Sequence, residues 1–309
     1  MEKYIKIARP DHWIKNLFLF PGAFFALFFV GFSFRAEMFF RLLLAFAATC
    51  LLSSANYVLN EWLDAGTDRY HPIKKNRPAV TGHLNPRLVW PEYGLLAAAG
   101  LALSLPEDLP FFFTGTALLF MGCVYNIPPV RTKDLPYLDV VTESVNNALR
   151  LLLGWFAVTA EFYPPVSLIV GFWTGGAFLM AIKRFAEYRM IGDPAVAARY
   201  RRSFRKYTER SLLISSFFYA MCSVFFIGVF LVKYRIELIL AMPPLCGLFC
   251  LYFFISFKKD SAVQKPEKLY REKFLMAYVA AFLVLVILLM FVDIPQLSGL
   301  LDTTPVRVG

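Results

Sequence analysis

Residues 39–59 read FFRLLLAFAATCLLSSANYVL, and residues 60–68 continue without a break as NEWLDAGTD. The first run is apolar and, at about 20 residues, long enough to cross a bilayer as a helix. Asn60, Asp64 and Asp68 follow at four-residue spacing, so a continuing helix places them on one face. One amide oxygen and two carboxylates on one face form a site suited to Mg²⁺. The stretch predicts a membrane helix that ends in a metal site.

Apolar runs of this length recur along the chain, in which 58 % of residues are hydrophobic. These runs are too uniformly apolar for barrel strands, which alternate polar and apolar faces, so we expect helices. We predict an all-α polytopic membrane protein, with a single domain over residues 1–309. Its nine transmembrane helices are expected at about 17–34, 38–60, 88–106, 110–126, 138–160, 164–186, 211–232, 236–257 and 274–293.

Basic residues are distributed unevenly between the two ends of these helices. They cluster at the amino terminus and in the segments after the second, fourth, sixth and eighth helices. This bias predicts an integral protein of the cell (inner) membrane, with a cytoplasmic amino terminus and an outer carboxyl terminus. The net charge of +10 would then face the cytoplasm, where it attracts anionic lipid heads or phosphorylated substrates. No segment resembles a DNA-binding module, so we expect no nucleic-acid partner.

The loop after Asp68 adds a basic cluster to the acidic helix end. Lys74, Lys75 and Arg77 lie within nine residues of Asp68 and suit phosphates rather than metal. A solvated helix end is the alternative explanation of the two aspartates. The array of three oxygen-bearing residues next to three bases favours a site for a diphosphate.

The segment from Tyr125 to Lys133 begins where the fourth helix is expected to end. Two consecutive prolines stop that helix and force an extended turn. Arg131 and Lys133 could then contact a phosphate. Asp139 and Glu143 share a face at the start of the fifth helix, although Asp139 could instead cap that helix.

Arg150 lies well inside the fifth apolar segment. An arginine at that depth costs several kcal/mol unless it is paired or faces a polar cavity. We therefore interpret Arg150 as functional, with a structural ion pair to Glu143 as the alternative.

The inner end of the sixth helix carries Lys183, Arg184 and Glu187. Lys183 and Glu187 are one turn apart and could simply pair with each other. Residues 199–207 come next as a basic and aromatic stretch, which we interpret as an amphipathic segment lying against lipid heads.

The spacing Asn60-x3-Asp64-x3-Asp68, after the second of nine helices, resembles the first aspartate-rich motif of the UbiA superfamily of intramembrane prenyltransferases. The resemblance covers nearly the whole chain in helix number, orientation and motif order. It implies a nine-helix bundle whose central cavity opens sideways to lipid, with Mg²⁺ holding a diphosphate. The chain departs from the motif at Glu61, where most members have Asp.

A second resemblance concerns the branch of this superfamily. Typical prenyltransferases carry a second Asp-x3-Asp motif on the sixth helix, where this chain has Lys183-Arg184-x2-Glu187. That replacement is similar to the decaprenyl-phosphate phosphoribosyltransferase branch. Further matches are Arg9-Pro10-x2-Trp13-x-Lys15-Asn16, His71-Pro72-x-Lys74-x2-Arg77-Pro78, Leu149-Arg150 with Gly154, and Pro266-Glu267-x-Leu269. The likeness implies a 5-phosphoribosyl 1-diphosphate donor and a polyprenyl phosphate acceptor.

The resemblance also implies roles for individual residues. Asn60, Asp64 and Asp68 would hold Mg²⁺, and Asp64, Asp68 and Lys183 would be catalytic. The substrate-binding residues would be Lys15, Asn16, Lys74, Lys75, Arg77, Tyr125, Arg131, Lys133, Asp139, Arg150, Arg184 and Glu187.

Two alternatives stay open at this point. The segment from Tyr125 to Lys133 also resembles a loop of prenyl-transferring members, which move a polyprenyl chain from its diphosphate to an aromatic or polar acceptor. The other alternative is a transporter or lipid-binding membrane protein with an inactive site.

Overall fold

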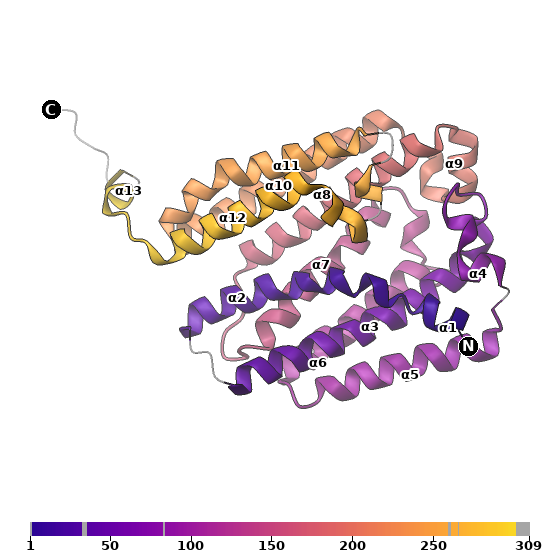
Figure 1. The fold of residues 1–309 in the computed structure, drawn as a ribbon, viewed down its shortest axis with the longest axis horizontal. Helices are drawn as coiled ribbons and strands as arrows, with labels where there is room; N and C mark the ends of the chain where they lie inside the picture. The colour runs from indigo at the N-terminus through magenta and orange to yellow at the C-terminus, as the bar shows by residue number, and fades with distance from the viewer. Residues whose placement is uncertain (1, 33–35, 83, 259–260, 265, 301–309) are drawn as a thin grey trace.

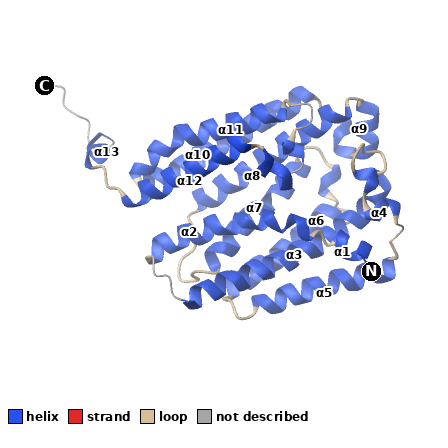
Figure 2. Cartoon of the chain, in the orientation of Figure 1, coloured by secondary structure: helices blue, strands red, loops and turns tan. Residues whose placement is uncertain are grey.

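The computed structural model describes residues 2–32, 36–82, 84–258, 261–264 and 266–300. All regular secondary structure in these residues is helical (Figure 2). The long helices are α2 (Leu19–Val30), α3 (Ala36–Asp68), α5 (Pro86–Ser104), α6 (Leu109–Asn126), α7 (Leu138–Phe156), α8 (Val166–Ile191), α10 (Glu209–Tyr234), α11 (Met242–Ser256) and α12 (Lys273–Phe291). The short helices are α1 (Glu2–Ile7), η1 (Pro10–Phe18), η2 (Lys74–Asn76), α4 (Pro78–Thr81), η3 (Thr132–Asp134), α9 (Pro194–Tyr200), η4 (Arg202–Arg205), η5 (Ile236–Ala241), η6 (Ala262–Gln264), η7 (Pro266–Arg271) and α13 (Pro295–Leu300).

Seven helical stretches in the described part of the chain are long and apolar enough to cross a membrane. The predicted total of nine spans is therefore not confirmed. The two that differ are α5 and α7, which form where helices were predicted but do not meet this measure. Charged side chains reduce their apolar character, above all Asp139, Glu143 and Arg150 on α7.

The long helices lie side by side along the length of the molecule (Figure 1). The amino terminus lies at the same end as α1, α4 and α9, whereas α13 lies beyond the opposite end of the bundle, after α12. Side chains from the segments after α3, α6 and α8 meet at the amino-terminal end, where they form ion pairs and hydrogen bonds with one another and with the helix ends.

Residues 192–208, here called the strap, connect α8 to α10 and contain α9 and η4. Gly192 ends α8 in the left-handed region (φ 72°), which glycine adopts at little cost. Asp193 caps α9, because its side chain accepts a hydrogen bond from the backbone N–H of Ala195. At the other end Thr208 and Ser211 form a reciprocal cap that starts α10.

Helices α2 and α7 approach each other closely through two glycines. A Cβ added to Gly22 would lie 1.9 Å from the carbonyl oxygen of Leu151, and one added to Gly154 would lie 1.8 Å from that of Leu19. Only glycine fits at such backbone contacts, which are common between membrane helices. The contact brings the end of η1 beside the middle of α7.

Candidate active site

A cavity of about 390 Å³ lies between α3, α6, α7, α8 and the strap. Eight lysine or arginine side chains line it, against three carboxylates. The basic residues are Arg9, Lys15, Lys74, Arg77, Arg150, Lys183, Arg184 and Arg201, and the acidic ones are Asp64, Glu143 and Glu187. A wall of this composition favours polyanionic ligands.

The structure brings most of the residues that were predicted for the site to this cavity. Those on its wall are Lys15, Asn60, Asp64, Lys74, Arg77, Tyr125, Arg150, Lys183, Arg184 and Glu187. The others do not line it, namely Asn16, Asp68, Lys75, Arg131, Lys133 and Asp139. Except for Lys75, which is exposed, these residues contact a side chain or backbone group of the wall.

The last three turns of α3 carry the predicted metal ligands. The helix continues to Asp68, so Asn60, Asp64 and Asp68 do lie on one face. The Asn60 amide donates to Asn126 Oδ1 at 2.6 Å. Asp68 accepts from Arg77 Nη1 at 2.5 Å and is 2 % exposed.

Asp64 forms ion pairs with two bases from the segment after α6. Arg131 Nη2 lies 3.0 Å from Asp64 Oδ1, and Lys133 Nζ contacts the same oxygen. Lys133 also donates to Asn126 Oδ1 at 2.8 Å. Burial lowers the pKa of Lys133 to about 8, although the neighbouring Asp64 opposes this shift. The two bases support the carboxylate from behind the cavity wall.

The side-chain oxygens of Asn60, Asp64 and Asp68 are of the kind that usually holds Mg²⁺ beside phosphates. The part of the chain that the structure describes has no cluster of three His, Cys, Asp or Glu residues that could hold a metal. Mg²⁺ beside substrate phosphates commonly takes one or two carboxylates and completes its shell with water and phosphate oxygens. Asn60 and Asp64, which face the cavity, meet that requirement, and Asp68 lies one turn further along.

The segment after α3 is fixed by His71. The backbone N–H groups of Ile73 and Lys74 both lie 3.1 Å from His71 Nδ1, which therefore accepts. The proton must then be on Nε2, which lies 3.4 Å from Glu187 Oε1. Burial lowers the pKa of His71, which favours this neutral form.

Lys74 reaches from this segment across the cavity to α8. Its ammonium lies 2.5 Å from Glu187 Oε1 and contacts the Tyr200 hydroxyl. Glu187 therefore pairs with Lys74, and not with Lys183 as the one-turn spacing had suggested. The contact joins the segment after α3 to both α8 and the strap.

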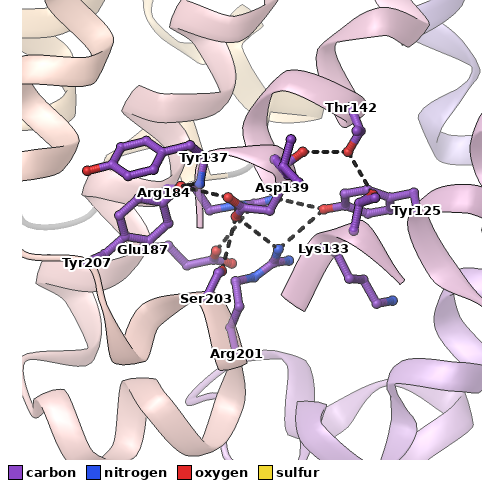
Figure 3. A network of polar contacts seen from close by, with 12 residues as sticks. Tyr125, Lys133, Tyr137, Asp139, Thr142, Arg184, Glu187, Arg201, Ser203 and Tyr207 are labelled. Carbon is purple, nitrogen blue, oxygen red and sulfur yellow. Dashed lines mark hydrogen bonds and ion pairs between the residues drawn. The ribbon is translucent and has the colours of Figure 1, made fainter. Parts of the chain in front are cut away.

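Arg184 and Asp139 form the centre of a buried polar network (Figure 3). Arg184 donates to Asp139 Oδ2 at 3.2 Å, to Glu187 Oε2 at 3.4 Å and to the Tyr125 hydroxyl at 3.0 Å. Asp139 also accepts from Tyr207 at 2.7 Å and is completely buried. Burial raises the pKa of the Tyr207 hydroxyl, and the nearby Asp139 carboxylate raises it further.

Asp139 therefore does not cap α7, because its carboxylate is turned toward α8 and the strap. Ser203 Oγ lies 3.2 Å from Asp139 Oδ2, and Arg201 Nη1 lies 3.6 Å from it. With four such partners and no exposure, this carboxylate supports residues of the cavity wall. The contact of Asp139 with substrate stays a prediction.

Arg150 pairs with an amide and a carbonyl rather than with Glu143. Its Nε donates to Asn16 Oδ1 at 2.8 Å, and its Nη1 donates to the Asn146 carbonyl at 3.2 Å. Asn16 is fully buried and also accepts from Ser53. Asn16 thus orients Arg150, whose positive charge remains without a carboxylate partner among the described residues.

Lys183 is a second cation on the wall without a carboxylate partner. No hydrogen bond or ion pair joins its ammonium to another residue in the described ranges, and its side chain faces the cavity. Its ammonium is partly buried, which is costly for a charge that has no partner.

Sequence reasoning missed the strap. The stretch 199–207 was interpreted as lying against lipid heads, but Tyr200, Phe204 and Tyr207 are at most 4 % exposed and pack together beside α8. Their spacing of four and three residues is the signal of a buried helical face, and it fits packing on protein as well as on lipid. The strap contributes Tyr200 and Arg201 to the cavity wall.

The chain resembles known proteins along most of its length. The UbiA prenyltransferase family model matches residues 18–280. A decaprenyl-phosphate phosphoribosyltransferase from Mycolicibacterium smegmatis is 28 % identical over 214 residues, which are 67 % of this chain and 63 % of that protein. A protoheme IX farnesyltransferase from Geobacillus kaustophilus is 31 % identical over 180 residues, 57 % of each protein. The chain thus matches less than two thirds of the length of either relative.

The fold is also known from experiment. A UbiA homologue from Archaeoglobus fulgidus, solved with DMAPP and Mg²⁺, superposes with a TM-score of 0.68 and 22 % identity. The match covers 92 % of this chain and 99 % of that one. At this level of identity the likeness demonstrates a common fold.

Proposed function

Because this chain belongs to the UbiA prenyltransferase family of intramembrane transferases, we propose that it is a phosphoribosyltransferase that uses Mg²⁺. The donor would be 5-phosphoribosyl 1-diphosphate, the acceptor a polyprenyl phosphate of the decaprenyl type, and the second product diphosphate. The observation that carries the proposal is the excess of eight bases over three carboxylates on the cavity wall. A sugar phosphate, a diphosphate and a lipid phosphate together require more cations than one prenyl diphosphate does.

Asn60 and Asp64, with Asp68 beyond them, would hold Mg²⁺ through their oxygens. The ion would neutralise charge on the diphosphate as it leaves. Lys74 and Arg77 line the cavity from the segment after α3 and would hold phosphate oxygens. Both already contact carboxylates, so a phosphate would compete for the same donors.

Arg150 and Lys183 are the bases that we assign to the acceptor phosphate. Neither has a carboxylate partner among the described residues, so binding an anion would break no ion pair. In the reaction the bond between ribose C1 and the diphosphate oxygen breaks, and a lipid phosphate oxygen bonds to C1 from the opposite face. The acceptor is already an anion, so no strong general base is needed, and positioning lowers the barrier.

The proposal is tested by offering two labelled donors to the detergent-purified protein with Mg²⁺. Labelled 5-phosphoribosyl 1-diphosphate is supplied with decaprenyl phosphate, and labelled polyprenyl diphosphate is supplied with a panel of aromatic acceptors. We expect label in a lipid-linked pentose phosphate from the first pair. Transfer in the second pair alone would refute the phosphoribosyl assignment.

Prenyl transfer is the second candidate, and the similarity to the farnesyltransferase favours it. In that case the same three α3 residues would act on the diphosphate of a lipid instead of a sugar. Lys183 and Arg184 would then stand where typical prenyltransferases of the family are expected to have a second metal motif. An enzyme of this kind would release diphosphate only when a prenyl diphosphate is supplied.

We also propose that the cavity end of the bundle faces the cytoplasm, where a soluble sugar diphosphate would be available. The amino terminus lies at this end and the carboxyl-terminal helix at the other (Figure 1). Labelling of single cysteines introduced near each end, in intact cells and in inverted vesicles, tests this orientation.

A further inference from the structure

The guanidinium of Arg201 on the strap packs over two rings but has few polar partners among the described residues. It lies 5.8 Å from the centroid of the Tyr200 ring and 6.0 Å from that of Phe204. The polar contacts of this side chain to described residues all use Nη1, which lies 3.3 Å from the Tyr125 hydroxyl and 3.6 Å from Asp139 Oδ2. Nε is buried and has no hydrogen-bond partner among the described residues. Because the guanidinium has five N–H donors in a rigid fork, most of its hydrogen-bonding capacity is left over.

The nearby carboxylates already have other partners. Asp139 accepts from Arg184, Ser203 and Tyr207 at shorter distances than the one to Arg201. Glu187 lies beside Lys74 and Arg184. Asp139 and Glu187 are thus shared among Lys74, Arg184 and Arg201. The need to neutralise Asp139 therefore does not explain why an arginine occupies position 201.

The side chain of Arg201 is 11 % exposed, and the residue lines the cavity. Figure 3 shows its guanidinium beside Asp139 and next to the Tyr125 ring. Arg184 donates to the same Tyr125 hydroxyl, so the two guanidinium groups are neighbours on one wall. Adjacent guanidinium groups with spare donors match the geometry of phosphate oxygens.

We propose that Arg201 binds a phosphate monoester and makes the strap one side of a monoester subsite, separate from the diphosphate site on α3. This inference rests on the proposed function, in which both substrates carry a monoester: the 5-phosphate of the donor and the headgroup of the acceptor. A prenyl diphosphate and an aromatic acceptor would carry none. The strap therefore contributes to substrate selection.

The test is equilibrium binding to the purified full-length protein, measured by titration calorimetry in detergent. The probes are ribose 5-phosphate, farnesyl phosphate, and inorganic diphosphate with Mg²⁺. Arg201→Gln should weaken binding of at least one monoester about 10- to 100-fold and leave diphosphate binding within about 3-fold. Loss for ribose 5-phosphate assigns the subsite to the donor, and loss for farnesyl phosphate assigns it to the acceptor.

Arg202→Gln is the matched control in the same strap. Arg202 is 70 % exposed and its ion-pair partner is Asp134, away from the cavity, so all three probes should bind unchanged. Arg201→Lys keeps the charge but not the fork, and should bind the monoester with intermediate affinity even if Arg201→Gln does not fold.

Three results would overturn the inference: equal weakening of diphosphate and monoester binding, no weakening in Arg201→Gln, or no monoester binding by the unaltered protein. Failure of the proposed function is seen separately, in the transfer assay with labelled donors. An enzyme that binds monoesters through Arg201 but transfers only prenyl groups would refute the function and keep the subsite.

Discussion

Asp139→Asn tests whether this aspartate supports the wall or touches substrate. The native carboxylate is completely buried and accepts from Arg184 at 3.2 Å, Ser203 at 3.2 Å and Tyr207 at 2.7 Å. An asparagine keeps one oxygen but turns an NH₂ group toward either Tyr207 or Arg184, and both of these are donors. Arg184 also loses one of its two buried carboxylate partners and keeps only Glu187. Removing one partner of a buried ion pair typically costs about 3–5 kcal/mol.

We expect Asp139→Asn to lower the free energy of unfolding by about 3 kcal/mol or more. The measurement is reversible unfolding in mixed micelles with SDS, followed by circular dichroism. Activity per folded molecule should fall much less than in a variant of Asp64, because Asp139 does not line the cavity.

Asp134→Asn is the control for this experiment. Asp134 also pairs with two arginines, Arg131 at 3.2 Å and Arg202 at 3.6 Å, but its side chain is 20 % exposed. Its replacement should cost about 1 kcal/mol or less. Equal losses in the two variants, or a stable but inactive Asp139→Asn protein, would refute the supporting role.

Three further substitutions separate activity from stability. Asp64→Asn should reduce turnover at least about 100-fold while the protein stays folded; retained transfer of label would remove Asp64 as a metal ligand. Lys183→Gln should leave unfolding unchanged, because its ammonium has no partner in the described ranges, yet raise the KM for a phosphorylated substrate about 10-fold; a loss of stability with normal KM would show a structural role. Gly154→Ala should destabilise the bundle by about 1–3 kcal/mol or more, since the new Cβ would lie 1.8 Å from a carbonyl oxygen. Its control is Gly94→Ala, where nothing lies within 4 Å; similar thermal stability of these two glycine variants would contradict the packing argument.

The sequence predicted the helices well because the signal is local. Uniform apolar runs and polar interruptions predicted the positions of the long helices, and α3 extends through Asp68 as the four-residue spacing requires. The number of spans was harder to predict, because α7 combines a membrane-length helix with Asp139, Glu143 and Arg150. The length of such a helix predicts a membrane span, whereas its charged residues argue against one.

The partners of the charged residues could not be predicted in the same way. Arg150 pairs with Asn16, which is 134 residues away, and Lys74 pairs with Glu187, which is 113 residues away. Sequence spacing suggested Glu143 for Arg150 and Lys183 for Glu187, since only near neighbours can be judged along one helix. Arg201 was missed because a basic aromatic segment looks the same whether it packs on lipid or on protein.

The glycine contact between α2 and α7 limits how this protein can evolve. At most packed positions a larger residue can be accommodated when a neighbour becomes smaller. At Gly22 and Gly154 the atoms in the way are the backbone carbonyls of Leu151 and Leu19, which no substitution can shrink. A suppressor of a change at either glycine would have to shift a whole helix, and that shift would separate Asn16 from Arg150. Selection for the active site and selection for the packing of these two helices therefore act on the same few positions.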